Sequence, residues 1–333
     1  MTSLPEVAAV AAPSENRSTH VSSGQWHTAI VLGLLIGVPV VATGFVTFQM
    51  TMLLVYAIAL IGLNILTGFT GQFSLGQNAF FAIGGYTSVI LIEHLHVHYL
   101  LSIPIAGIVA SLAGIIFAFP ALRLKGVYLA LATFALGTAL PQILKIEQFE
   151  EWTGGVQGMI TEKPETPFNW PISQDTYIFY LVLAFTVAVY LLSNNLLRSK
   201  TGRALLAIRE NDVAASAMGV NVAFYKTVAF ALSAGVTGIA GALGALVVQF
   251  VAPDGYTIQL AVALFLGIVI GGVGWLPGTL VGAAFIVFVP NIAEDISKGL
   301  SGAVFGVLIL FVIFVLPRGA QQLTELITGR RDN

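Results

Sequence analysis

Long apolar runs separated by short polar stretches repeat along almost the whole chain. They lie at 28–48, 50–68, 74–93, 99–118, 126–144, 176–195, 224–251, 257–273, 275–291 and 300–317. An α-helix needs roughly 20 apolar residues to cross a bilayer, and each run is about that long. The pattern therefore predicts an all-α polytopic membrane protein with about ten transmembrane helices. Two boundaries stay open, because the first two runs are separated only around Phe48, and the eighth and ninth only around Gly274 and Pro277.

The composition supports a membrane protein and excludes a water-soluble globule. Of the 333 residues, 57% are hydrophobic and only 9% are charged, whereas about a quarter of an ordinary soluble domain is charged. The net charge of −2 argues against nucleic acid as a partner. Because the chain has no cysteine, disulfides, thiolate metal sites and a cysteine nucleophile are also excluded.

Lysine and arginine orient the predicted helices, because basic residues collect in cytoplasmic loops. With ten helices and both ends in the cytoplasm, only Lys145, Lys163 and Lys298 of the 14 basic residues face outward. The other basic residues are Arg17, Arg123, Lys125, Arg198, Lys200, Arg203, Arg209, Lys226, Arg318, Arg330 and Arg331. An odd number of helices would place one of the basic clusters on the wrong side, so we expect ten helices and two cytoplasmic termini.

The remaining segments are expected to form tails and loops. Residues 1–26, rich in Ser, Pro and small residues, predict a mobile cytoplasmic tail, and 321–333 a cytoplasmic C-terminal tail. Between them, 27–320 would form the transmembrane domain, with an external loop at 146–175 and a cytoplasmic loop at 198–223. The first apolar run is interpreted as an uncleaved helix.

Two absences bear on how the chain works. No charged side chain has to lie at mid-bilayer, where proton-coupled carriers and ion pumps usually place one. A sodium-coupled carrier stays open, because backbone carbonyls can bind sodium. The chain also lacks the glycine-rich loop with lysine that holds ATP phosphates. Energy for uphill transport would therefore enter through a partner.

The stretch 67–78 places polar side chains and three glycines between apolar segments. In lipid, each unsatisfied polar group would cost several kcal/mol, so the stretch should face protein or a water-filled path. Two interpretations stay open: the lining of a translocation pathway, or a headgroup-level loop between two helices. The candidate pathway-lining residues are Asn64, Gln72, Ser74, Gln77 and Asn78.

The predicted cytoplasmic loop contains a short helix signal. Asn211 or Asp212 can cap its start, and Gly219 can end it in the left-handed conformation. So short a helix is unstable alone in water. Two interpretations stay open: a helix held by the bundle and docked into a groove of a soluble partner, or a solvated connector. Residues four positions apart lie on the same face of a helix. Two such pairs, Val213 with Ala217 and Ala214 with Met218, would form a small apolar knob on this helix.

The run 202–221 resembles the signature loop of permease subunits from branched-chain amino acid ABC importers of the LivM type. Its centre reads Arg-Glu-Asn-Asp-Val-Ala-Ala-Ser-Ala-Met-Gly. Four further stretches resemble the same family and lie at 67–87, 153–158, 271–278 and 316–319. The first of them contains the sequence Gly-Gln-Phe-Ser-Leu-Gly-Gln. The resemblance covers residues from about 60 to 320.

This resemblance implies a type II ABC importer permease that forms a heterodimer with a second, homologous permease. Two cytoplasmic ATPases, which bind ATP and magnesium, and an external substrate-binding protein would complete the transporter in a bacterial inner membrane. The chain itself would be neither an enzyme nor a cofactor-binding protein. Its coupling helix at 212–219 would receive movement from the ATPases. The residues implied in coupling are Arg209, Glu210, Asp212, Val213, Ala214, Ala215, Met218 and Gly219.

Other functions stay open beside this one. Importers of urea or short amides share these motifs, and a sodium-coupled carrier or a purely structural membrane scaffold belongs to a different class. His94, His96 and His98 alternate outside the third run, but without cysteine or a second cluster they favour interfacial solvation. We therefore expect no metal site.

Overall fold

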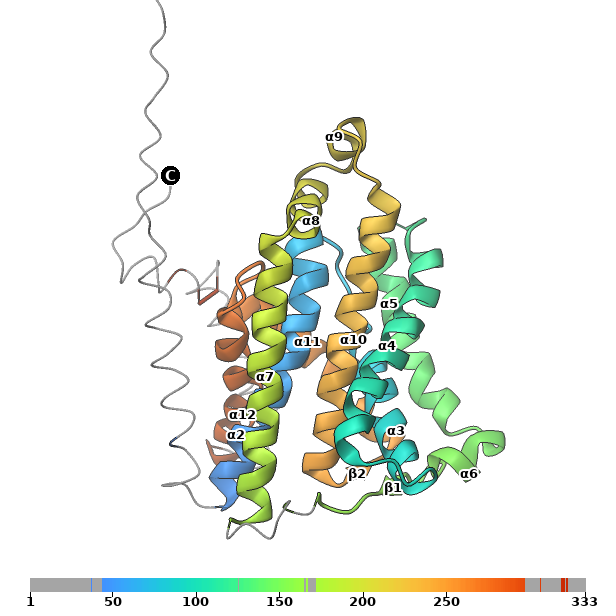
Figure 1. Ribbon diagram of the computed structural model, residues 1–333, viewed down its shortest axis with the longest axis vertical. Helices are drawn as coiled ribbons and strands as arrows, with labels where there is room; N and C mark the ends of the chain where they lie inside the picture. Colours follow the sequence, from blue (N-terminus) through green and yellow to red (C-terminus); the bar gives the residue numbers. More distant parts are fainter. Residues whose placement is uncertain are drawn as a thin grey trace, which may run out of the picture. The chain divides into compact units, whose positions relative to one another are not determined.

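The computed structural model describes residues 37, 44–124, 126–164, 166, 172–296, 306, 319, 320 and 322. Most of these residues are helical (Figure 1). Most of the first predicted run, the last run at 300–317 and both predicted tails lie outside the described residues. The boundaries proposed for the tails and loops therefore stay predictions.

Eight long helices correspond to the second to ninth predicted runs. They are α2 (Gly44–Leu63), α3 (Gln77–Glu93), α4 (Tyr99–Ala121), α5 (Val127–Leu144), α7 (Gln174–Arg198), α10 (Val222–Val248), α11 (Ile258–Gly271) and α12 (Gly278–Ile296). The eighth and ninth runs are thus separate helices. The all-α class is confirmed.

Shorter elements connect these helices. The π-helix η1 (Asn64–Gly68) continues α2, and η2 (Glu147–Phe149) with α6 (Glu150–Thr153) follows α5. Two more helices, α8 (Lys200–Glu210) and α9 (Asp212–Ala217), join α7 to α10, and η4 (Pro253–Tyr256) precedes α11. Strands β1 (Met159–Ile160) and β2 (Phe250–Val251) pair antiparallel, with Met159 opposite Val251.

Within the described residues, six helical segments are long and apolar enough to cross a membrane. They are α2 with η1, α4, α5, α7, α10, and η4 with α11. The chain is therefore a multi-pass membrane protein, while the count of ten helices stays a prediction because two runs lie outside the described part.

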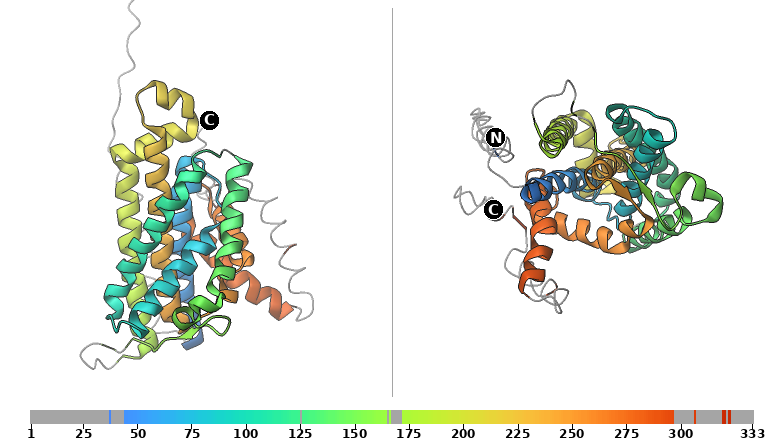
Figure 2. Two further views of the ribbon diagram at one scale, coloured as in Figure 1. Left: turned by 90° about the vertical axis from the view of Figure 1, so that its right-hand side faces the viewer. Right: turned by 90° about the horizontal axis from the view of Figure 1, so that it is seen from below.

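The central helix of the bundle is α10, which packs against α2, α3 and α4 (Figure 2). Small residues allow these helices to pack closely. For example, a carbon added to Gly114 of α4 would lie 2.6 Å from Ala234 Cβ of α10. A carbon added to Gly84 of α3 would collide with the Gly238 carbonyl of α10. Because lipid gives no hydrophobic drive for helix association, such contacts gain their energy from close packing. The hairpin of α11 and α12 uses Gly267, Gly271, Gly278 and Gly282 in the same way.

The two ends of the bundle differ in their elements. One end, called here the coupling-loop end, carries α8 and α9, and the opposite end carries α6, β1 and β2 (Figure 1). At the opposite end, the Lys145 ammonium pairs with the Asp254 carboxylate at 2.5 Å. Together with the β1–β2 pairing, this contact ties the segment after α5 to the segment between α10 and α11.

Candidate coupling site and interior polar residues

Helix α8 covers the coupling-loop end of the bundle. The Ser199 hydroxyl caps its start by accepting a hydrogen bond from the Thr201 amide at 3.1 Å. Leu205 and Ile208 are buried, whereas Arg203 and Glu210 are exposed. This is the pattern of a helix with one face on a core. The sequence predicted a cytoplasmic loop with one short helix at 212–219, so α8 is a second helix that was not predicted.

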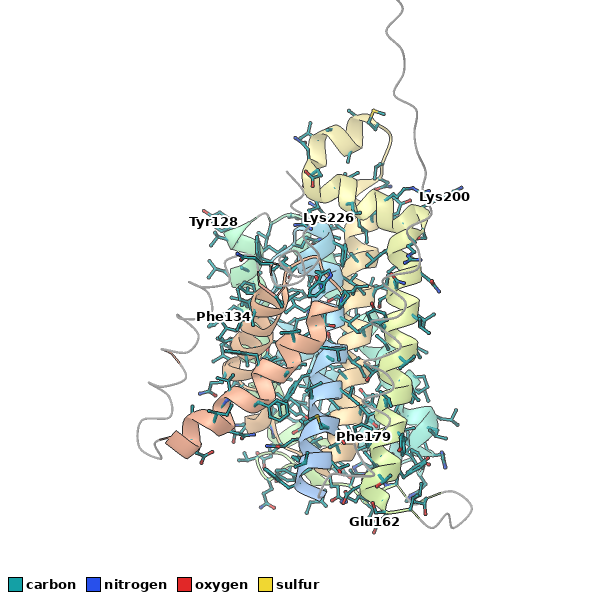
Figure 3. All side chains as sticks on the ribbon, turned by 90° about the vertical axis from the view of Figure 1, so that its left-hand side faces the viewer. Tyr128, Phe134, Glu162, Phe179, Lys200 and Lys226 are labelled. Carbon is teal, nitrogen blue, oxygen red and sulfur yellow. The ribbon has the colours of Figure 1, made fainter. Side chains whose placement is uncertain are left out.

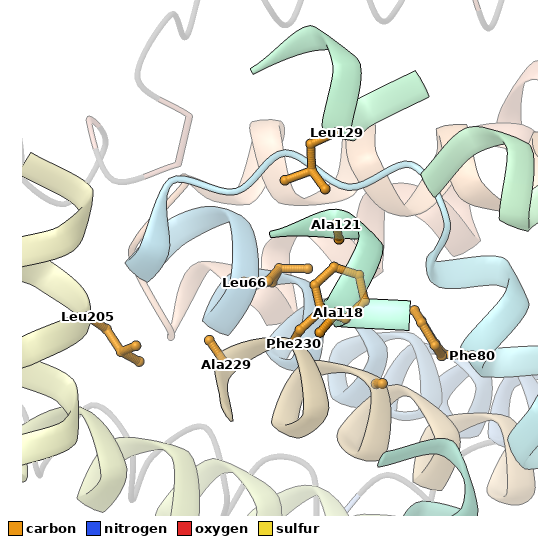
Figure 4. Packing of buried hydrophobic residues seen from close by; sticks show 9 residues of the cluster. Leu66, Phe80, Ala118, Ala121, Leu129, Leu205, Ala229 and Phe230 are labelled. Atoms are coloured by element: carbon orange, nitrogen blue, oxygen red, sulfur yellow. The ribbon is translucent and has the colours of Figure 1, made fainter. Parts of the chain in front are cut away.

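Leu205 anchors α8 in a hydrophobic cluster at this end of the bundle (Figure 4). The cluster draws side chains from six different elements, and the rings of Phe80 and Phe230 meet edge to face with centroids 5.8 Å apart. Its other large members are Leu66 and Leu129. Helix α8 is therefore part of the folded bundle and is not a loose connector.

The short helix predicted in the loop is present as α9. The Asn211 side chain caps it and accepts hydrogen bonds from the amides of Val213 and Ala214 at 2.9 and 3.0 Å. Gly219 follows with a left-handed φ of +85°, as a helix-ending glycine does. The predicted start and end are confirmed, with Asn211 as the cap.

The side chains of α9 divide into an exposed tip and an anchored base. Val213 and Met218 are 74% and 85% exposed, and Ala214 is also exposed. Ala215 is only 4% exposed, so it turns toward the chain and cannot form the contact surface. Asp212 holds the base through an ion pair with Lys226 of α10 at 2.5 Å.

A cavity of about 340 Å³ lies beneath the coupling loop. Its lining comes from the loop after η1, from the turn between α4 and α5, and from the α8–α9 junction. Glu210 lines it, is exposed, and forms no ion pair within the described part of the chain. Among the lining side chains are Gln72, Phe73, Leu129, Arg209 and Lys226.

Arg209 points into the bundle end. Its Nη1 donates a hydrogen bond to the carbonyl oxygen of Gly68, the last residue of η1, at 2.6 Å. The resemblance grouped Arg209 with residues that face an ATPase, and the sequence held no signal for a partner 141 positions away. The side chain thus connects α8 to η1.

Three of the five candidate pathway residues lie around the break between α2 and α3, and all three are buried. Asn64 Nδ2 donates to the Trp275 carbonyl at 3.1 Å, and its Oδ1 accepts from the Gly274 amide at 2.9 Å. Gln72 Nε2 donates to Thr70 Oγ1 at 3.2 Å. Ser74 Oγ accepts from the Gly76 amide at 3.4 Å, a long hydrogen bond.

The other two candidates, Gln77 and Asn78, begin α3 and are fully enclosed by neighbouring helices. Gln77 Nε2 donates to Ser233 Oγ at 2.9 Å, and Gln77 Oε1 accepts from Thr237 Oγ1 at 2.9 Å, both on α10. Asn78 Nδ2 lies 2.8 Å from the Gly137 carbonyl of α5. We call Gln77 and Asn78 the amide pair.

Asn78 also contacts the start of α11. Its Nδ2 lies 2.9 Å from the Tyr256 carbonyl and 3.3 Å from the Thr257 carbonyl. The two N–H groups of this amide are shared among the three carbonyls, of which Thr257 also accepts from the Leu260 amide at 3.1 Å. They satisfy acceptors that lipid could not. The Oδ1 of Asn78 has no hydrogen-bond partner in the described structure. The polar stretch is thus held by contacts within the chain, and its role in lining a pathway stays a prediction.

The three alternating histidines follow α3 near the opposite end, where His94 and His98 make separate contacts. The His94 ring lies 5.1 Å from the Trp152 ring, and the His98 side chain caps α4 by accepting from the Leu100 amide at 3.3 Å. Among the described residues, no three His, Asp or Glu side chains are placed to hold a metal ion.

Known proteins resemble this chain over most of its length. Residues 45–313 match the family described as "Branched-chain amino acid transport system / permease component". The LivM permease proteins of the high-affinity branched-chain amino acid transport systems of Salmonella typhimurium and Escherichia coli are 29% and 30% identical over 298 residues. In both cases the match covers 83% of this chain and 69% of the relative.

An archaeal protein is also similar. A probable branched-chain amino acid transport permease protein LivM of Methanocaldococcus jannaschii is 27% identical over 245 residues, which are 69% of this chain and 70% of the relative. No solved structure matches the chain.

Proposed function

This chain belongs to the family of branched-chain amino acid transport permease components, and we propose that it is the membrane subunit of an ATP-driven importer for branched-chain or hydrophobic amino acids. It forms the translocation path together with a second, homologous permease. Two cytoplasmic ATPases supply the energy, and an external binding protein delivers the substrate. The ATPases bind ATP and magnesium, and this chain binds neither.

The exposed tip of α9 carries this proposal. Val213 and Met218 place apolar side chains in water on α9, which projects beyond the other described helices (Figure 1). The base of the same helix is fixed by Ala215 and by the Asp212–Lys226 ion pair. An apolar tip on an anchored base suits a contact that receives force from a soluble partner.

The charges support a cytoplasmic position for this tip. Lys200 and Lys226 lie at the coupling-loop end, and Glu162 lies at the opposite end (Figure 3). Arg198, Arg203 and Arg209 belong to the same end as α8. Because basic residues stay on the cytoplasmic side of bacterial inner membranes, the tip faces the compartment that contains ATP. Both termini are then cytoplasmic.

Glu210 is the residue best suited to an ionic contact with an ATPase. It is exposed, lies next to the cap of α9 and has no ion-pair partner in the described part of the chain. A basic side chain of the ATPase would complete this pair at the rim of an apolar contact, where a charge pair adds specificity more than affinity.

The mechanism is alternating access. Closure of the ATPases around ATP moves α9, and the movement changes the packing between helices until the path opens to the other side. The binding protein docks at the opposite end, near α6, β1 and β2. Substrate selection lies mainly in that protein, in keeping with the lack of a charged residue that must lie at mid-membrane.

Reconstitution tests the function. The tagged chain is purified with its associated subunits, placed in proteoliposomes with the binding protein and ATP, and offered leucine or urea. We expect ATP-dependent accumulation of leucine and none of urea. Accumulation of urea instead would identify an amide importer, accumulation by the chain alone a secondary carrier, and no flux at all a scaffold. Each of these three results contradicts the proposal.

A further inference from the structure

Two breaks between consecutive helices meet at the coupling-loop end: the break after α2 and η1, and the break between α11 and α12. We refer to the helices on either side of these breaks as the two interrupted helices. The π-helix η1 ends at Gly68, and the turn between α11 and α12 lies beside it. The Asn64 amide joins the two, because its Nδ2 donates to the Trp275 carbonyl and its Oδ1 accepts from the Gly274 amide. A carbon added to Gly68 would lie 2.6 Å from the Gly274 nitrogen, so the two backbones are in direct contact.

Arg209 reaches this meeting point from α8. Besides the 2.6 Å hydrogen bond to the Gly68 carbonyl, its Nη1 would lie 2.7 Å from a carbon added to Gly274. Gly274 has a φ of +87°, so both backbone conformation and space require glycine there. We call Asn64, Gly68, Arg209 and Gly274 the arginine junction.

The chemistry of the contact favours a cation. The last carbonyl groups of a helix lack partners within the helix and carry its partial negative charge. A guanidinium that donates to one of them therefore gains both a hydrogen bond and a favourable interaction with the helix dipole. Short π-helical turns such as η1 also occur often at functional sites. Arg209 is the one side chain of α8 that hydrogen-bonds to this junction among the described residues.

We propose that Arg209 is a positioning residue that transmits movement of the coupling loop to the two interrupted helices. When α9 and α8 are displaced together, the guanidinium moves the end of η1 and, through Asn64 and Gly274, the turn between α11 and α12. Both places have an irregular backbone, a π-helical turn at η1 and a left-handed Gly274, so fewer regular helical hydrogen bonds oppose their movement. The inference rests on the proposed function, because it assigns a path to the movement that the ATPases deliver.

The test measures leucine uptake and ATP hydrolysis in the same proteoliposomes. Arg209→Met removes the donors, Arg209→Lys keeps the charge without the planar fork, and Arg203→Met is the matched control. Arg203 lies on the same helix and is exposed, and its Nη1 donates a long hydrogen bond of 3.4 Å to the nearby Arg198 carbonyl. All variants are made in the complete transporter.

We expect Arg209→Met to lower the leucine transported per ATP about tenfold, the scale of one charge-assisted hydrogen bond, while ATP hydrolysis continues. Arg209→Lys should give an intermediate ratio, and Arg203→Met should equal the wild type. A merely structural role of Arg209 would lower uptake and hydrolysis in parallel through loss of assembled transporter.

Three results would overturn the inference. One is wild-type uptake and hydrolysis rates in Arg209→Met, and another is a parallel loss of both rates, which leaves their ratio unchanged. If Arg209→Met does not assemble, Arg209→Lys decides, and a wild-type ratio in that variant is the third. A wild-type transporter that takes up no leucine with ATP overturns the proposed function as well, so the two failures are distinguished by the wild-type sample.

Discussion

The amide pair and the arginine junction both stabilise a break between helices, but they do so with different side chains. Both hold a break in a helix, and both use side chains to satisfy backbone groups. Gln77 and Asn78 are neutral and completely buried, and they bind three neighbouring helices through short side chains. Arg209 is charged, lies partly in water, and spans from one segment to another with a long side chain.

Because of this difference, we expect the amide pair to hold its helices in place and the arginine junction to allow movement. A buried amide that loses its partners leaves carbonyl groups without donors, so the neighbouring helices cannot separate at low cost. A guanidinium at the bundle end can exchange a protein carbonyl for water and return. We therefore expect substitutions in the amide pair to change stability, and substitutions around the coupling loop to change transport.

The largest effect is expected for Asn78→Leu. The change leaves the carbonyls of Gly137 and Tyr256 without the donor that Asn78 supplies, and each unsatisfied group costs about 1–3 kcal/mol. The thermal midpoint of the purified transporter should fall by many degrees. Asn291→Leu is the control, because Asn291 is exposed and donates only to a carbonyl of its own helix, α12. Equal midpoints for the two variants would contradict the supporting role of Asn78.

A charge on the exposed tip of α9 should abolish transport without affecting stability. Val213→Asp places a carboxylate in the proposed apolar contact, and burying it unpaired would lower uptake at least about tenfold. The midpoint should stay at the wild-type value, because Val213 is 74% exposed. Ala215→Asp is the contrast: this position is buried, so the variant should lose stability. Normal ATP-driven uptake by Val213→Asp would refute docking through the tip.

The smallest effects are expected for two ion pairs, one at each end of the bundle. The Asp212 and Lys226 side chains are 28% and 17% exposed, so Asp212→Asn should cost about 1 kcal/mol and weaken uptake slightly. At the opposite end the Asp254 side chain is 68% exposed, and Lys145→Gln should change the midpoint very little. A larger decrease of the thermal midpoint in Lys145→Gln than in Asp212→Asn would contradict this prediction.

Much of the helical architecture could be predicted from the sequence because membrane helices must be apolar throughout. The eight runs from 50–68 to 275–291 coincide with helices to within about six residues, and the largest shift is at α2, which begins at Gly44. Local signals also identified α9, since Asn211 and Gly219 act on their own neighbours. Helix α8 was missed because its apolar residues are few and its basic residues suggested a solvated loop.

The partners of the polar residues could not be predicted. Asn78 binds carbonyls up to 179 positions away, and Arg209 binds one 141 positions away. Residue types alone do not encode such distances. The sequence indicated that Gln77 and Asn78 need polar surroundings, but a water-filled path and an enclosed contact between helices impose the same requirement. Only the packing of α3, α5, α10 and α11 shows which carbonyls and hydroxyls these amides meet.

Site-directed cross-linking tests the central claim most directly, because the chain contains no native cysteine. Met218→Cys at the tip of α9, which is 85% exposed, is treated in the assembled transporter with a short cross-linker that carries a maleimide for the thiol and an amine-reactive ester for lysines of the partner. Ile160→Cys at the opposite end, 75% exposed, is the control. We predict a cross-link from position 218 to an ATPase subunit and none from position 160. A thiol at position 218 that forms no cross-link and stays open to labelling in the assembled transporter would contradict the account.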